Sequence, residues 1–172
     1  MMESTTQIQE FGDLKRRLAE LESRIEIANR MASYGPIVDA NLPEATAELW
    51  TEDGTYDAEI DKFEGRQGLM GMVTGELHQK LLAGGVGHFI GVPYIELRGD
   101  HATAVTHALL LVQRREGEDF KVWRVTATRW EWQKVGNTWH ILSRVNRKLD
   151  GGDTARSIFR DVFEKKILES SL

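Results

Sequence analysis

The sequence predicts an α+β fold, a cone-shaped roll in which N-terminal helices cover one side of a strongly curved, mostly antiparallel sheet. Two observations lead to this expectation. Helical periodicity dominates the first part of the chain, whereas runs rich in β-branched and aliphatic residues dominate residues 92–148 and are followed by one more helical segment. Because the helices mostly precede the strands, an antiparallel meander is expected, and a bent sheet closed by helices encloses a cavity.

The N-terminal part predicts two helices that meet near Asp39. Residues 1–10 are polar and aperiodic, so a frayed terminus is expected there. Gly35-Pro36 is expected to interrupt the first helix, because proline disfavours helical geometry in the residue before it, and Pro43 suits the first turn of a second helix through Trp50. The first helix carries an apolar stripe at steps of three and four, made of Leu14, Leu18, Leu21, Ile25, Ala28 and Ala32.

Shorter elements connect these helices to the predicted meander. Residues 55–58 and 61–64 are expected to pair as short strands, a helix is expected over 69–82, and the glycines of 84–87 indicate a loop. The chain is expected to end in an amphipathic helix over 153–170, which covers the cavity mouth or packs on a neighbour. The long strands are expected at 92–97, 101–113, 120–133 and 138–148, with a turn at 116–118.

Length and composition indicate one soluble globular domain spanning 1–172. The chain has 172 residues, of which 41% are hydrophobic and 28% charged. It contains no apolar run near twenty residues and no secretory signal pattern, so a cytoplasmic location and no membrane partner are expected. The absence of cysteine excludes disulfides and thiolate metal sites, and the net charge of -5 argues against nucleic acid as a partner.

His88 is the leading candidate for chemistry. It lies in the stretch Gly87–Gly91, at the mouth of a predicted buried strand, where its ring could face a cavity. Histidine suits proton abstraction because its ordinary pKa is near neutral, and a carboxylate on the other ring nitrogen would fix its tautomer. Asp39 is the predicted partner. From the residues alone, the alternatives are a satisfied core histidine and an aspartate that caps a helix or turn.

Other side chains could complete such a site. Tyr34 and Tyr56 could donate hydrogen bonds to a carbonyl or a departing hydroxyl, or could be core aromatics. Trp130 could floor an apolar pocket for a flat ring, or fill the core. His78, His101 and His140 are expected to be exposed. No His-x-x-x-His or similar spacing occurs on one element, so no metal site is expected.

The last predicted strand leaves the position of Arg144 open. Strict alternation places Arg144 and Asn146 on one face of this strand and Trp139 and Ile141 on the other. If the first face lines the cavity, Arg144 and Asn146 lie inside it. If it does not, Arg144 is an ordinary surface charge, and the tryptophan and isoleucine form the core face.

Several motifs, in this order, resemble the SnoaL-like family of the nuclear transport factor 2-like superfamily, in the branch of scytalone dehydratase, bile acid 7α-dehydratase and hexachlorocyclohexane dehydrochlorinase. The resemblance covers roughly residues 20–150. The motifs are Tyr34 with Asp39, Trp50–Gly54 running into Tyr56, Phe63–Gly65, His88–Gly91, and Gly136–Trp139.

The resemblance implies roles for individual residues. It implies an Asp-His dyad at Asp39 and His88, a nearby tyrosine at Tyr34, and an arginine at Arg144, five residues after the last-strand tryptophan. Some members carry a second histidine on the strand after the catalytic one, and His107 is the candidate here for contacting substrate, if a one-residue gap brings it into the site.

The implied activity is that of a cofactor-independent lyase of dehydratase type. It would take a proton from a hydrophobic ring substrate such as a steroid, polyketide or aromatic-pathway intermediate. The alternatives are an isomerase or polyketide cyclase on the same scaffold, and a non-catalytic binding or assembly module. A homo-oligomer, dimer or trimer, is also expected, because the N-terminal stripe and the sheet face offer apolar surface.

Overall fold

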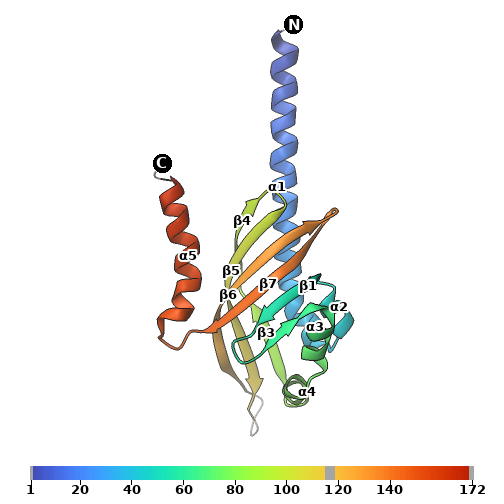
Figure 1. The fold of residues 1–172 in the computed structure, drawn as a ribbon, viewed down its shortest axis with the longest axis vertical. Helices are drawn as coiled ribbons and strands as arrows, with labels where there is room; N and C mark the ends of the chain where they lie inside the picture. The colour runs from blue at the N-terminus through green and yellow to red at the C-terminus, as the bar shows by residue number, and fades with distance from the viewer. Residues whose placement is uncertain (1, 115–118, 171–172) are drawn as a thin grey trace.

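The computed structural model describes residues 2–114 and 119–170 and shows one curved sheet with helices on both faces (Figure 1). This is the predicted α+β roll. The described strands lie in the order β2-β1-β7-β6-β5-β3, and β4 pairs with another part of β5. All pairings are antiparallel except that of β1 with β7. The strands are β1 (Trp50–Asp57), β2 (Lys62–Glu64), β3 (Val86–Ile90), β4 (Tyr94–Arg98), β5 (His101–Gln113), β6 (Phe120–Val135) and β7 (Thr138–Lys148).

The first helix, α1 (Met2–Asp39), is longer at both ends than the sequence predicts. The expectation of a frayed terminus over 1–10 is wrong from residue 2 onward, since good helix formers such as glutamine and glutamate continue the helix there. The expected interruption at Gly35-Pro36 is also wrong. Pro36 lies in the last turn, where it removes only one backbone hydrogen bond, and the buried Tyr34 and Val38 hold that turn against the rest of the core.

The segment between α1 and the meander differs from prediction in three places. The short helix α2 (Pro43–Ala47) ends before Trp50, which begins β1 instead. The single helix expected over 69–82 starts earlier and is divided at Gly75 into α3 (Gly65–Thr74) and α4 (Glu76–Ala83), because Gly75 has an extended ψ of 153°. His88 lies in the middle of β3 and not in a loop, because β5 supplies a partner strand for residues 86–90.

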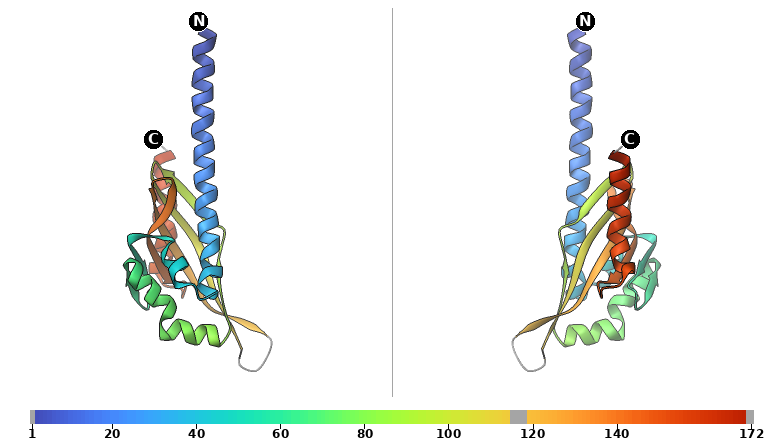
Figure 2. Two further views of the ribbon diagram at one scale, coloured as in Figure 1. Left: turned by 90° about the vertical axis from the view of Figure 1, so that its right-hand side faces the viewer. Right: turned by 90° about the vertical axis from the view of Figure 1, so that its left-hand side faces the viewer.

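The sheet separates two apolar layers. The inner layer lies under α1–α4 and contains four fully buried tryptophans, Trp50, Trp130, Trp132 and Trp139. The outer face is covered by α5 (Asp153–Ser170), whose Ala155, Ile158 and Val162 pack against Val105 and Ala127 (Figure 2). The last helix therefore spans the predicted residues but lies on the sheet face away from α1, and none of its described residues lines the cavity. The turn expected at 116–118 lies outside the described residues.

Candidate active site

Asp39 and His88 form a hydrogen-bonded pair although 49 residues separate them. Asp39 is the last residue of α1, and its Oδ1 lies 2.6 Å from His88 Nδ1. Its other oxygen, Oδ2, accepts the backbone N–H of His88 at 2.9 Å. Partial burial opposes ionisation of Asp39, but the two hydrogen bonds and the neighbouring imidazole outweigh it, so the pKa of this carboxyl lies below its ordinary value. An ionised carboxylate only accepts, so Nδ1 carries the proton and Nε2 is left with its lone pair.

The pair exists because α1 approaches β3 closely. At Gly35, one turn before Asp39, an added Cβ would lie 2.1 Å from the carbonyl oxygen of His88. No larger residue fits without a backbone shift. The glycine that sequence patterns assign to a helix break therefore serves instead as the contact point that sets α1 against the strand carrying His88.

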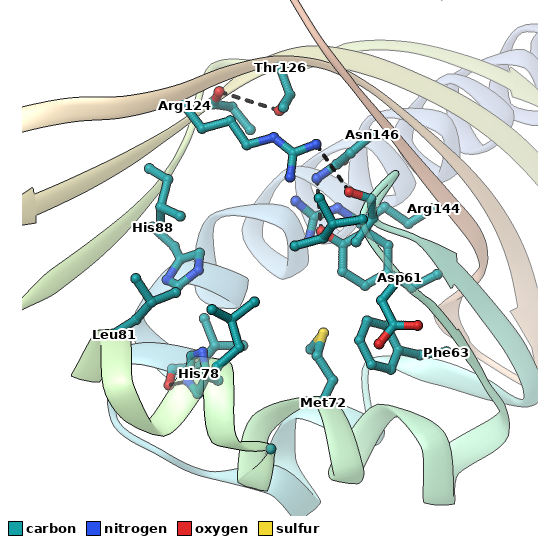
Figure 3. Close-up of a pocket in the computed structure, with 18 of the residues that line it drawn as sticks. Asp61, Phe63, Met72, His78, Leu81, His88, Arg124, Thr126, Arg144 and Asn146 are labelled. Carbon is teal, nitrogen blue, oxygen red and sulfur yellow. Dashed lines mark hydrogen bonds between the residues drawn. The ribbon is translucent and has the colours of Figure 1, made fainter. Parts of the chain in front are cut away.

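His88 faces a cavity of about 320 Å³ enclosed between the sheet and the helices (Figure 3). Apolar side chains from the helices and from the sheet form most of its wall, including Val38, Met72, Leu81 and Ile90. The polar side chains are few and come from different elements. A cavity of this size with a small number of polar groups is typical of a site for a small, largely apolar molecule.

Arg144 lies within the cavity lining and is 3% exposed. Its Cζ lies 4.2 Å from the ring centroid of Tyr34, 4.6 Å from that of Tyr56 and 4.1 Å from that of Trp130. Its Nε and Nη1 have no hydrogen-bond partner among the residues that the structure describes, and no carboxylate there pairs with it. The aromatic faces partly compensate the buried charge. Two donor nitrogens of this buried guanidinium are therefore unsatisfied in the part of the chain that the structure describes.

A β-bulge in β7 explains why Arg144 is inside. Strict alternation predicts that Arg144 and Trp139 lie on opposite faces, and this is wrong. The pairing with β6 passes over Leu142, so the strand holds one extra residue and its alternation shifts by one position. Trp139, Ile141, Arg144 and Asn146 are therefore all buried, and the first two belong to the inner core.

The two predicted tyrosines are both in the cavity wall. Tyr34 is 3% exposed, and burial raises the pKa of its hydroxyl above the ordinary value although the charge of Arg144 opposes the shift. It is therefore a neutral donor at physiological pH. Its ring lies 6.4 Å from that of His88. The Tyr56 hydroxyl accepts a 2.8 Å hydrogen bond from Asn146 Nδ2, so each of these two side chains fixes the position of the other.

Two residues predicted to contact substrate, His107 and Trp130, lie outside the cavity lining. His107 is exposed on the outer face of β5 and stacks against Phe159 of α5, with ring centroids 4.8 Å apart. No shift of one residue occurs at this point of β5, because the register with β6 is continuous from His101 to Leu110. Trp130 is fully buried and does not line the cavity. It lies behind the wall, in contact with Tyr34 and Arg144.

His78 is a cavity residue that the sequence analysis missed, since its position beside charged residues predicts exposure. It is 9% exposed, and its ring centroid lies 5.7 Å from that of His88. Its Nε2 lies 3.0 Å from the carbonyl oxygen of Val38, so this nitrogen donates. Burial, followed by the effect of His88, lowers the pKa of His78 despite that hydrogen bond. A neutral second imidazole thus faces the Asp39–His88 pair. The sequence signal that could have indicated this position is its spacing from Leu81 and Leu82, three and four residues later on the partly buried face of α4.

Arg124 is a second cavity residue that sequence patterns did not indicate. It contributes to the wall together with Thr126 of the same strand, but it pairs with Glu59 and donates to the Ala58 carbonyl at 3.1 Å. The positive charge of Arg124 is therefore neutralised by Glu59, unlike that of Arg144. Within residues 2–114 and 119–170, no three acidic or histidine side chains form a metal-binding group, and no helix is long and apolar enough to cross a membrane.

Comparison with known proteins identifies a family and a fold. Residues 19–145 match the model of the SnoaL-like domain. An NTF2-like protein with a cystatin-like fold from Novosphingobium aromaticivorans is 35% identical, with a TM-score of 0.82 over 86% of this chain and 95% of that one. No curated protein is similar enough to count as a match.

Two more distant structures share the fold. Hexachlorocyclohexane dehydrochlorinase LinA-type3 from Novosphingobium barchaimii is 18% identical, with a TM-score of 0.67 over 77% of this chain and 90% of that one. ActVI-ORFA from Streptomyces coelicolor is 15% identical, with a TM-score of 0.64 over 73% of this chain and 96% of that one. At these identities the similarity establishes a common architecture.

Proposed function

The chain belongs to the SnoaL-like family, and from this premise we propose that it is a cofactor-independent lyase of dehydratase type acting on a hydrophobic ring substrate. The observation that carries the proposal is the 2.6 Å contact between His88 Nδ1 and Asp39 Oδ1 beside the cavity. It leaves His88 Nε2 as a base. One structure of the same fold is, by its name, a dehydrochlorinase, an enzyme that eliminates a proton and a chloride from its substrate. This supports elimination as the reaction class.

The proposed reaction needs only the groups in the cavity. His88 Nε2 takes a proton from the carbon next to a carbonyl, and the electron pair of that C–H bond moves toward the carbonyl to form an enolate. The enolate electrons then form the new C=C bond as the C–O bond at the β-carbon breaks. The departing hydroxide takes the proton back from the imidazolium and leaves as water. Asp39 stabilises the imidazolium and holds the ring in position.

Arg144 and Tyr34 are the proposed stabilisers of the enolate. The buried guanidinium has two donor nitrogens without partners, and Tyr34 is held neutral by burial. Donors that are already in place, and shielded from water, stabilise developing negative charge without reorganisation. Tyr56 and Asn146 are proposed to contact the substrate on the same side of the cavity. Because this charge stabilisation also suits an isomerase or a cyclase, the product distinguishes the three reactions.

The test uses His88→Ala and Asp39→Asn on a panel of β-hydroxy ketones and ring substrates, with product mass as the readout. Each variant is expected to lower kcat/KM by about 100-fold or more, the range for loss of a general base or its orienting group. His101→Gln is the control, because His101 is exposed and outside the cavity. A product lighter than the substrate by one water identifies a dehydratase, and an unchanged mass identifies an isomerase or a cyclase. If both variants match the wild type on a confirmed substrate, the catalytic assignment is wrong.

A further inference from the structure

The N-terminal half of α1 extends beyond the sheet (Figures 1 and 2). Every position from 7 to 22 is exposed, and contact with the domain begins at Ser23 and Ile27. Arg24 secures this point with a 2.6 Å hydrogen bond to the carbonyl oxygen of Ile95. Most of the stability of a helix in a protein comes from packing of its apolar face, so a partner on this exposed segment would stabilise it.

The projecting segment carries a heptad stripe. Five large apolar residues recur at alternating steps of three and four, and each is more than half exposed. The stripe continues to the partly buried Ala28 and lies on a different face of α1 from the core residue Ile27. Alternating steps of three and four are the a and d pattern of a left-handed coiled coil. The a positions are Phe11, Leu18 and Ile25, and the d positions are Leu14 and Leu21.

The charges beside the stripe match a second copy in parallel. In a parallel coiled coil, a g residue lies near the e residue of the following heptad on the other helix. Here g residue Glu10 meets e residue Lys15, and g residue Arg17 meets e residue Glu22, so both contacts join opposite charges. An antiparallel pair opposes g to g and e to e. In the register that uses the whole stripe, Lys15 meets Glu22 favourably, but Arg17 is brought against Arg24, whereas both parallel contacts are favourable.

The ion pairs within α1 leave these flanking charges free. Arg16, on the outer side of the helix, pairs with Asp13 and Glu20 of its own helix. Glu10, Arg17 and Glu22 form no ion pair within the residues that the structure describes. The charges that point away from the stripe are thus neutralised along α1. Beside the stripe, Lys15 Nζ lies 4.5 Å from the centroid of the Phe11 ring, and the other three charges have no ion-pair partner in the part of the chain that the structure describes.

We propose that residues 7–28 pair with the same segment of a second copy of this chain as a parallel, two-stranded coiled coil. Ile25 at an a position, with leucine at both d positions, favours two strands over three. None of the stripe residues lines the cavity, so each protomer keeps its own complete site. The inference is independent of the proposed lyase activity.

Two substitutions test the stripe on the full-length chain by sedimentation velocity. The wild type is expected to be a dimer, and Leu18→Asp a monomer with unchanged near-ultraviolet circular dichroism, because Leu18 is more than half exposed and belongs to neither core cluster. Arg16→Glu, at an outer position two residues away, is expected to remain a dimer. A monomeric or trimeric wild type, or a dimeric Leu18→Asp, overturns the proposal.

The direction of the helices is tested by cysteine crosslinking, which is unambiguous because the chain has no cysteine. In the parallel register, each d residue faces its own counterpart, so Leu14→Cys is expected to oxidise to a covalent dimer. In the antiparallel register that uses the whole stripe, residue 14 faces residue 25 and no crosslink forms. Arg16→Cys is the control that should stay uncrosslinked. Failure of Leu14→Cys to crosslink in a dimeric protein overturns the parallel arrangement.

Discussion

At the scale of single residues, the cavity contains two arginines with opposite electrostatic roles. Arg124 is paired with Glu59, whereas Arg144 lies against three aromatic rings and has no carboxylate partner among the described residues. A buried cation without a carboxylate costs several kcal/mol of desolvation, and contacts to ring faces recover about 0.5–2 kcal/mol each. A chain under selection for stability alone would not retain such a group. Its position therefore argues for a bound negative charge.

Substitution of Arg144 is expected to separate activity from stability. Arg144→Met should lower kcat/KM by about 100-fold or more, since a preorganised donor to the enolate is lost, while the urea midpoint of unfolding stays the same or rises. Arg147→Met in the same strand is the contrasting variant. It removes a paired arginine, so it should destabilise the protein. A destabilised but fully active Arg144→Met would show that Arg144 is only structural.

At the scale of secondary-structure elements, the site depends on how closely α1 approaches β3. Neither element contains the active pair alone: the helix ends with the carboxylate, and the strand presents the imidazole. The close contact at Gly35 sets their separation. A helix displaced by even one ångström would lose the 2.6 Å hydrogen bond between Asp39 and His88, so the glycine maintains this bond through backbone position.

Gly35→Ala is expected to destabilise the protein by at least about 2 kcal/mol, because the new Cβ would lie 2.1 Å from the His88 carbonyl oxygen and force α1 outward. Gly12→Ala is the matched control in the same helix. Nothing lies within 4 Å of its Cβ position, so it should raise helix stability by up to about 1 kcal/mol. Urea unfolding measures both. Equal stability of Gly35→Ala and wild type would contradict the close contact.

At the scale of the whole molecule, the two ends of the fold are joined where β1 pairs in parallel with β7. Arg147 of β7 donates from Nη1 and Nη2 to the two carboxylate oxygens of Asp57 in β1, both at 2.9 Å. This ion pair links the early helix-rich half of the chain to the end of the meander. It lowers the pKa of Asp57 to about 2, chiefly through the hydrogen bonds from Arg147.

The ion pair predicts an acid-dependent loss of stability. Because the folded pKa of about 2 lies below the ordinary 3.8, the stabilisation is complete above pH 3.8 and is lost as the pH falls through about 2. Asp57→Asn should lower the free energy of unfolding by about 1 kcal/mol at pH 7, allowing for solvent screening, and flatten its decline in acid. Asp100→Asn, at an exposed turn, is the control. Parallel pH profiles for Asp57→Asn and wild type would contradict the prediction.

Sequence periodicity by itself determined the class of fold, the long strands and the final helix, because alternation and helical spacing are local properties of the chain. The motif order also identified Asp39, His88, Tyr34 and Arg144 as neighbours. Neither periodicity nor motif order could determine which residues face the cavity at positions where strict alternation fails. The extra residue at Leu142 turns Arg144 inward, and an unbroken register keeps His107 outside.

Long-range packing decided the remaining features. The last turn of α1 continues past Pro36 because Tyr34 and Val38 are buried in the core, and His78 enters the cavity because α4 lies across the end of α1. Side-chain type and spacing were therefore sufficient to predict elements and candidate chemistry. Only the tertiary structure determined orientation, because the face a residue presents depends on bulges and contacts between segments that are distant in sequence.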